Sequence, residues 1–234
     1  MLRKMPMILA MVLGLACVAN ATIETFDTDL GQFNDVAGTR ENGQDWGWSD
    51  SSNAGGASGP GELGGTFQRT DTWPHAVDTT IGTFQPTDTL VIRGCAVMSD
   101  INWDGGVDVG YFRQSDSSHN KLGFSLSEPK DGGPRIFLQV GPGNYYLHTT
   151  VEWDVPFTFD LTYENGTLSG TVNGVSGSLS GNPGEVDSFG VGVGMMGPEP
   201  LQVNVFLDDL EYTPEPATLA LLGLGGLALI RRKR

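Results

Sequence analysis

Two pairs of carboxylates stand at a spacing that can do chemistry in this chain: Glu152 with Asp154, and Asp209 with Glu211. Alternate residues of a β-strand share one face of the sheet, so the two members of such a pair can project together. Paired carboxyl groups are the acid and nucleophile that glycosidic bond cleavage needs. Pro156 follows the first pair closely, and the second pair lies in the last apolar run. We therefore expect both pairs to be solvent-facing charges rather than catalysts.

Oxygen-bearing side chains between residues 100 and 108 resemble a calcium loop. Ligands fall at the first, third, fifth and ninth positions, with a glycine at the sixth, and these ligands are Asp100, Asn102, Asp104 and Asp108. The last ligand position holds Tyr111 instead of a bidentate carboxylate, and no helical pattern flanks the loop. The open alternatives are a looser calcium site and an ordinary acidic turn.

Isolated aromatic residues are candidates for sugar binding, because their faces stack on the apolar faces of sugars while nearby polar groups bind hydroxyls. The best candidates are Trp46, Trp48, Trp73 and Tyr145, followed by Trp103 and Tyr146. Each of them could instead be a packing aromatic. The three histidines are far apart in the sequence and show no metal-ligand spacing. Cys95, inside an apolar run, is expected to be a buried small hydrophobe.

The N-terminus has the pattern of a secretory signal peptide. Arg3 and Lys4 precede an apolar run, and Ala19 and Ala21 form a small-residue cleavage site. We expect signal peptidase to cut after Ala21, so that residues 1–21 are the signal peptide. A lipoprotein cysteine at Cys17 is the alternative.

The C-terminus combines a proline break, an apolar run over residues 217–230 and a basic end. The apolar run would form a helix of about 21 Å at 1.5 Å per residue, shorter than the hydrocarbon core of about 30 Å. The basic end should stay cytoplasmic. The residues that carry the pattern are Pro214, Glu215, Pro216, Arg231, Arg232, Lys233 and Arg234.

This tail, residues 214–234, closely resembles the PEP-CTERM sorting signal of exported bacterial proteins. The resemblance implies that a membrane enzyme, an exosortase, recognises Pro214, Glu215 and Pro216 and removes the hydrophobic tail, which is in the membrane only transiently. It also implies a place at the cell surface or in an exopolysaccharide, biofilm or floc matrix. An ordinary tail anchor is the alternative.

The 192 residues between the two termini are strongly acidic. They contain seven basic and 27 acidic side chains, a net charge of −20. Such a surface repels phosphate backbones, so a nucleic-acid partner is disfavoured. Glycine is abundant, 34 of 234 residues, and no window of the body has a sustained helical period. These features exclude a coiled coil or long-helix protein.

Short apolar runs separated by turn residues predict an all-β body over residues 22–213. Alternation is clearest in Phe157–Tyr163, and Asn165-Gly166 and Asn173-Gly174 are tight hairpin turns. Residues 40–86 are expected to form long loops with a few short strands. Many short antiparallel strands with glycine-rich turns predict a two-sheet, jelly-roll-like β-sandwich in one domain, flanked by an N-terminal signal helix and a C-terminal hydrophobic helix.

The body also resembles, at the level of pattern, the concanavalin A-like lectin and glucanase sandwich. The entry Glu24–Asp27, the hairpin Phe157–Val172 and the closing run Val203–Tyr212 carry the resemblance. It implies pairing of the first and last strands and frequent carbohydrate binding. Sandwiches of this kind often hold calcium where those strands meet, and the candidate ligands there are Asp27, Asp29 and Asp209.

The leading functional hypothesis is an exported, exosortase-sorted, non-catalytic envelope or matrix protein that binds exopolysaccharide, and so not an enzyme. One alternative is a glycan hydrolase or lyase of the same fold. The other is a calcium-stabilised structural domain without a ligand.

Overall fold

The computed structural model describes residues 21–37, 47–56, 59–68, 75–101, 105–116, 121–130, 132–195 and 202–213. These residues are built from strands and one short 3₁₀ segment, η1 (Gln114–Asp116). The strands are β1 (Thr22–Glu24), β2 (Asp35–Ala37), β3 (Gly47–Ser49), β4 (Glu62–Gln68), β5 (His75–Asp78), β6 (Leu90–Ile101), β7 (Gly105–Phe112), β8 (Lys121–Lys130), β9 (Gly133–Val140), β10 (Gly143–Thr150), β11 (Phe157–Glu164), β12 (Thr167–Val172), β13 (Val175–Ser180), β14 (Ser188–Met195) and β15 (Gln202–Tyr212).

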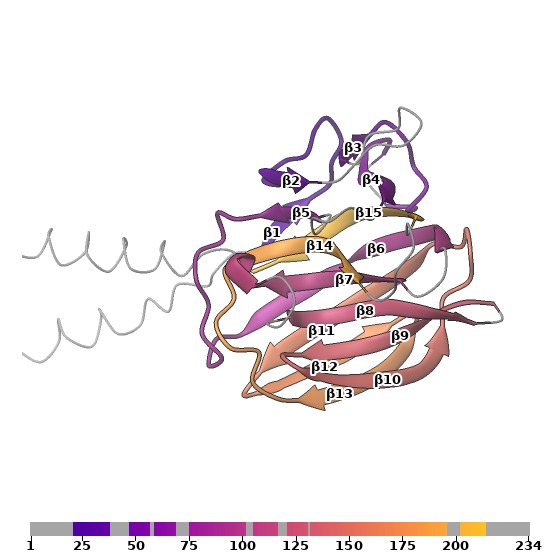
Figure 1. The fold of residues 1–234 in the computed structure, drawn as a ribbon. Coiled ribbons are helices and arrows are strands. Elements are labelled where there is room, and N and C mark those ends of the chain that lie inside the picture. Colours follow the sequence, from indigo (N-terminus) through magenta and orange to yellow (C-terminus); the bar gives the residue numbers. More distant parts are fainter. Residues whose placement is uncertain are drawn as a thin grey trace, which may run out of the picture.

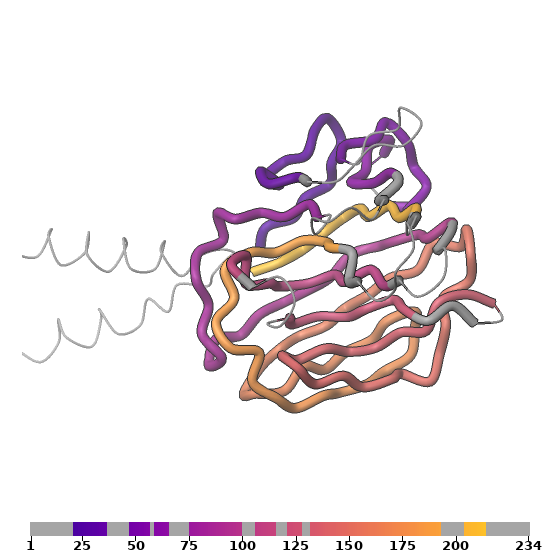
Figure 2. The backbone as a smooth tube through the Cα atoms, in the orientation of Figure 1, coloured from indigo at the N-terminus to yellow at the C-terminus, as the bar shows by residue number. Residues whose placement is uncertain are grey.

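Two antiparallel sheets face each other, as the sequence predicts for a jelly-roll-like sandwich (Figure 1). Sheet A has the order β13-β12-β11-β6-β15-β4-β3, with β1 paired to β15. Sheet B has the order β10-β9-β8-β7-β14-β5-β2. Neighbours such as β6 and β15 are far apart in the sequence, so the fold is closed by long-range pairing (Figure 2).

Alternation along each strand decides which side chains enter the core. In β11 the residues Phe157, Phe159, Leu161 and Tyr163 are buried, and the residues between them face solvent or are half-buried. Sheet B contributes buried side chains to the same core, and those from β8 and β9 are Phe124, Leu126, Ile136 and Leu138. The two inner faces therefore form one continuous apolar core, whereas the two outer faces are free to carry polar chemistry.

The tight turns form where the sequence predicts them. Asn165 and Gly166 join β11 to β12 with φ values of 52° and 79°, and Asn173 and Gly174 join β12 to β13 with 51° and 73°. Both central residues of such a turn need positive φ, which asparagine and glycine adopt at low cost. These two hairpins place β12 and β13 at one margin of sheet A, and β10 of sheet B packs against β13 there.

The first and last strands of the described chain pair, as the resemblance implied. Thr22 is opposite Tyr212, and Glu24 is opposite Leu210. β15 is itself bonded to β6 on one side and to β4 on the other. Within residues 40–86, the described part contains the short strands β3, β4 and β5.

No helix among the described residues is long and apolar enough to cross a membrane. The expected signal helix and C-terminal hydrophobic helix fall outside the described residues, as do Ala19 and the sorting residues Pro214, Glu215, Pro216, Arg231, Arg232, Lys233 and Arg234.

Candidate functional site

The outer face of sheet B carries a row of polar and aromatic residues across adjacent strands. The pairing register places Tyr146 of β10, Phe137 of β9, Ser125 of β8 and Asp108 of β7 side by side. Their immediate neighbours along each strand, such as Ile136, Leu138, Leu126 and Val107, point into the core. Strands lie about 4.8 Å apart, so this row extends about 14 Å across the sheet.

Arg135, Tyr146 and His148 cluster at the β9–β10 end of the row. The Arg135 guanidinium lies 5.7 Å from the centre of the Tyr146 ring, a cation–π arrangement. The rings of Tyr146 and His148 have centroids 4.8 Å apart, and Phe137 lies 5.3 Å from Tyr146. A fixed cation, a phenol and an imidazole therefore share one small area.

A bulge in β10 sets the position of His148. Between Tyr146 and Thr150 the chain uses four residues where the partner strand uses two, from Phe137 to Arg135. His148 absorbs part of this irregularity with a φ of 57°, a left-handed conformation that non-glycine residues adopt rarely. Bulges re-aim side chains and occur often beside active sites. The strained backbone thus leaves the imidazole exposed beside Tyr146.

The other end of the row holds an ion pair between Lys121 and Asp108. Asp108 is 2% exposed although it lies on the outer face, and Lys121 donates to its carboxylate. The glycine pair Gly110 and Gly123 lies between the two positions in the register. A Cβ at Gly110 would come within 2.2 Å of a backbone oxygen of β8, so this floor stays free of side chains and the lysine can cross it.

The outer face of sheet A is dominated by carboxylates. Arg93 bonds to Asp160 and Glu211 at 2.8 and 2.9 Å. Burial raises the pKa of Asp208 to about 6, and the negative charges of Asp209, Glu62 and Asp27 add to this shift.

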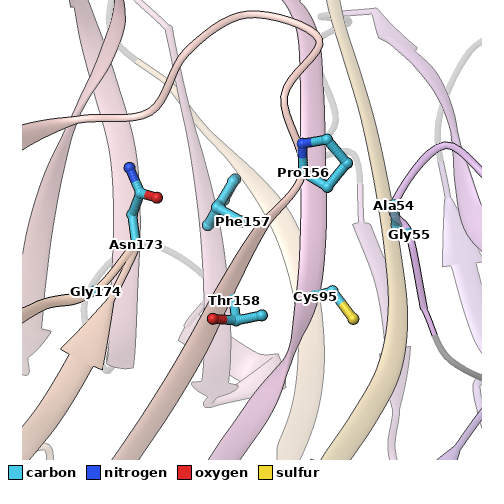
Figure 3. Close-up of a pocket in the computed structure, with 8 residues that line it drawn as sticks. All are labelled: Ala54, Gly55, Cys95, Pro156, Phe157, Thr158, Asn173 and Gly174. Atoms are coloured by element: carbon cyan, nitrogen blue, oxygen red, sulfur yellow. The ribbon is translucent and has the colours of Figure 1, made fainter.

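Glu62 organises the loop that covers part of this face. Its carboxylate accepts hydrogen bonds from the Ser51 hydroxyl, the Asn53 backbone and side-chain amides, and the Ala54 backbone. A pocket lies between this loop and the turn that joins β12 to β13 (Figure 3).

The carboxylate pairs singled out in the sequence are not arranged for catalysis. Glu152 and Asp154 are exposed in the connection between β10 and β11, and the Asp154 amide is bonded to the Met98 carbonyl. Glu211 is engaged by Arg93, and Asp209 lies at an irregularity of β15 with a φ of 50°. Neither pair therefore forms the facing acid and nucleophile that hydrolysis requires.

The calcium candidates are dispersed among other roles. Asp27 accepts a hydrogen bond from the Thr25 hydroxyl, and Asp29 accepts one from the Gly31 amide. Asp209 lies beside Cys95, and Asp108 is paired with Lys121. Within the described part of the chain, no three histidine, cysteine or acidic side chains are grouped so as to hold a metal ion. Asn102, Asp104 and the side chain of Asp100 lie outside the described residues.

The aromatic candidates for sugar binding are also not brought together at one place among the described residues. Tyr145 is 43% exposed and lies next to the cluster, with its ring centroid 6.5 Å from that of His148. Trp48, on β3 at the edge of sheet A, is 38% exposed and donates its indole N–H to the Phe26 carbonyl. Trp46, Trp73 and Trp103 lie outside the described residues.

Sequence reasoning missed Arg135 and His148, because neither belongs to a motif. A signal was present in the alternation of two consecutive strands: Arg135 and Phe137 on one, and Tyr146 and His148 on the next. Cys95, expected to be buried, is half-buried and lines the sheet A pocket.

Residues 213–234 match the model of the PEP-CTERM protein-sorting motif. The motif marks the chain as an exported protein whose C-terminal tail is held in the membrane transiently and then processed by an exosortase. A search of curated protein sequences finds no match.

Solved structures with a similar fold include three alginate lyases. A family 7 alginate lyase, A1-II′, in complex with a product has 11% identity and a TM-score of 0.49, over 84% of this chain and 95% of that one. AlgAT5 of polysaccharide lyase family 7 has 14% identity and a TM-score of 0.47, over 64% and 77%. AlyA1 from Zobellia galactanivorans has 13% identity and a TM-score of 0.45, over 84% and 95%.

These neighbours correct the leading hypothesis from the sequence. The expectation of a non-catalytic matrix protein, and so not an enzyme, is wrong: the three similar structures named above are alginate lyases, and the alternative of a glycan hydrolase or lyase agrees with them better. At such identities the likeness describes the fold alone. The chemistry of this chain must therefore be argued from Arg135, Tyr146 and His148.

Proposed function

We propose that the protein is an exported polysaccharide lyase that cleaves an acidic, uronate-containing glycan on the outer face of sheet B. The observation that carries the proposal is the cluster of Arg135, Tyr146 and His148, in which a cation, a phenol and an imidazole lie within reach of one sugar ring. Alginate, the substrate class in the names of the similar structures, is the first candidate.

Elimination accounts for this set of groups. A base removes the proton on the carbon next to the uronate carboxylate, a double bond forms to the neighbouring carbon, and the glycosidic C–O bond breaks. The leaving oxygen takes up a proton, and no water is consumed. Arg135 would neutralise the carboxylate and the negative charge that develops on it. His148 and Tyr146 would exchange the two protons.

The carboxylate distribution favours elimination over hydrolysis. Hydrolysis needs two carboxyl groups flanking the scissile bond. On the outer face of the central strands β7, β8 and β9, the described carboxylate is Asp108, which is buried and bonded to Lys121. The exposed pair Glu152 and Asp154 lies in a loop. Elimination requires neither.

Localisation and processing complete the proposal. Signal peptidase removes residues 1–21, the exosortase acts at the tail, and the sandwich over residues 22–213 is released to the cell surface or the extracellular matrix. Tyr145, beside the cluster, would stack on a neighbouring sugar unit.

The test is incubation of the full chain, in detergent, with alginate, other uronate polymers and neutral glycans. The ultraviolet absorbance of the unsaturated uronate reports elimination, and reducing ends without that absorbance report hydrolysis. We expect unsaturated products from a uronate polymer, and loss of them in His148→Asn and Tyr146→Phe with an unchanged melting temperature. The proposal would be overturned if none of the uronate polymers gave unsaturated products, or if both variants cleaved at the rate of the unaltered chain.

A further inference from the structure

The pocket on the outer face of sheet A lies on the opposite side of the sandwich from the lyase cluster. Its volume is about 370 Å³, inside the range of small-molecule sites, about 300–1,000 Å³. Thr158 and Cys95, which are paired between β11 and β6, form its floor. Ala54 and Gly55 lie at one side of it, and Asn173 and Gly174 at the other (Figure 3).

Hydrogen-bonding groups of the pocket are directed by their other contacts. The Asn173 side-chain amide donates to the Thr150 carbonyl at 3.1 Å. This bond assigns the orientation of the amide and puts its carbonyl oxygen on the side of Phe157 and the pocket (Figure 3). The hydroxyl of Thr158 points toward the same side as Gly174 (Figure 3). Two oxygens are thus available to hydroxyl or amino donors of a ligand.

The sides of the pocket are formed by an apolar ring and by glycines, which have no side chain. The ring of Pro156 borders the floor, and a Cβ at Gly55 would already touch that ring at 3.4 Å. A Cβ at Gly174 would meet nothing within 4 Å, so the opposite side is open. An aliphatic ring beside two oxygens suits a sugar, which alternates C–H faces with hydroxyls.

The surrounding charge excludes an anion. The eight lining residues carry no charged side chain, but Asp208 and Asp209 lie beside the floor at Cys95. Burial and these two carboxylates raise the pKa of the Cys95 thiol to about 11, so the sulfur is neutral and the local potential is negative. A uronate would be repelled here, whereas a neutral or amino sugar would be tolerated or attracted.

We infer that this pocket is a second glycan site, which binds a sugar unit without a carboxylate, neutral or amino, through Thr158 and Asn173. The site would hold a polysaccharide different in charge from the uronate polymer proposed for the opposite face. The inference stands on the pocket alone and does not require lyase activity.

The test measures binding of cellobiose, a glucosamine dimer and a uronate dimer to the full chain by calorimetry. Thr158→Phe fills the floor, and Thr162→Phe is the matched control, since Thr162 is on the same strand and the same face. We expect saturable binding of a neutral or amino dimer, at least about tenfold weaker in Thr158→Phe and unchanged in Thr162→Phe. The bound sugar should also slow alkylation of Cys95, located by peptide mapping.

Three results would overturn the inference: no binding of either non-acidic dimer, binding that survives Thr158→Phe, or stronger binding of the uronate dimer at this pocket. Circular dichroism of both variants identifies a folding defect. If Thr158→Phe misfolds, protection of Cys95 in the unaltered chain still decides. Uronate cleavage by Thr158→Phe separates failure at this pocket from failure at the opposite face.

Discussion

The two outer faces of the sandwich differ in how they treat charge. Sheet B keeps an arginine on an aromatic ring and buries an ion pair over a glycine floor, whereas sheet A displays Arg93 between two exposed or half-buried carboxylates and crowds further acidic groups around Asp208. The same alternation builds both faces. One therefore suits an anionic polymer and the other repels it, inside a body of net charge −20.

The contrast teaches that net charge says little about a local site. Arg135 and Lys121 are two of only seven basic residues between the terminal signals, and both lie on the outer face of sheet B. A strongly acidic surface elsewhere does not cancel a basic area in which the cations are held by specific contacts.

The largest expected effect is on catalysis, and it is tested by removing one arginine from the outer face of each sheet. Arg135→Ala should lower kcat/KM for uronate cleavage by about 10²–10³-fold, because it removes the charge that stabilises the developing anion. Arg93→Ala removes the same side chain from sheet A and should leave kcat/KM unchanged. Steady-state kinetics of the two variants decide, and equal losses would refute the assignment of chemistry to sheet B.

The next effect concerns stability. Lys121→Met leaves the Asp108 carboxylate buried without its cation, which should lower the free energy of unfolding by about 3 kcal/mol. Asp108→Leu combined with Lys121→Met should recover most of that loss, since neither charge then remains. Urea denaturation measures both, and a loss in the double variant as large as in the single one would argue against a buried pair.

Asp208 gives a pH-dependent effect on sheet A. Its raised pKa means that the folded chain binds a proton on the Asp208 carboxyl more tightly than the unfolded chain does. The stabilisation that the protonated carboxyl gives to the folded state is therefore lost as the pH rises from about 4 to about 6. Asp208→Asn should therefore stabilise the protein at about pH 8, by up to about 3 kcal/mol, and not at pH 4. Melting curves at both pH values test this, with the exposed Glu164→Gln as control. A gain that is the same at both pH values would contradict it.

The smallest effect belongs to the ion pairs of sheet A. Arg93→Met should cost less than about 1 kcal/mol, because its bonds to Asp160 and Glu211 are largely exposed to solvent. The part of the free energy of unfolding that these ion pairs make dependent on salt should be lost in Arg93→Met. A cost as large as that of Lys121→Met would mean that the two faces do not differ in how they hold charge.

Much of the fold could be predicted from the sequence because its signals are local. Phe157–Tyr163 alternates cleanly, and each Asn-Gly turn requires only its own two residues. β13 was not predicted, since Val175 and Leu179 are too few to stand out among serine and glycine. The short strands β2 to β5 are held by partners distant in the sequence, such as Val77 opposite Gly190.

The candidate site was harder to predict because its parts belong to no motif. Arg135 and His148 each approach Tyr146 through a hairpin with a bulge, and a bulge of this kind has no sequence signature here. Lys121 and Asp108 meet only through the register of β7 and β8. Glu152 and Asp154 have the spacing of a carboxylate pair on a strand, but they lie in a loop.

The position of β15 has a mechanical consequence. This strand leads directly into the sorting tail and is bonded to β6 and β4 along both edges. A load applied at the C-terminal end, with the body held by a polymer on its faces, would pull β15 along its own axis and strain many hydrogen bonds at once. A load between the two ends would instead peel Thr22 from Tyr212 first, opening a three-residue strand bond by bond. The sandwich should therefore resist shear through its tail far better than separation of its two ends.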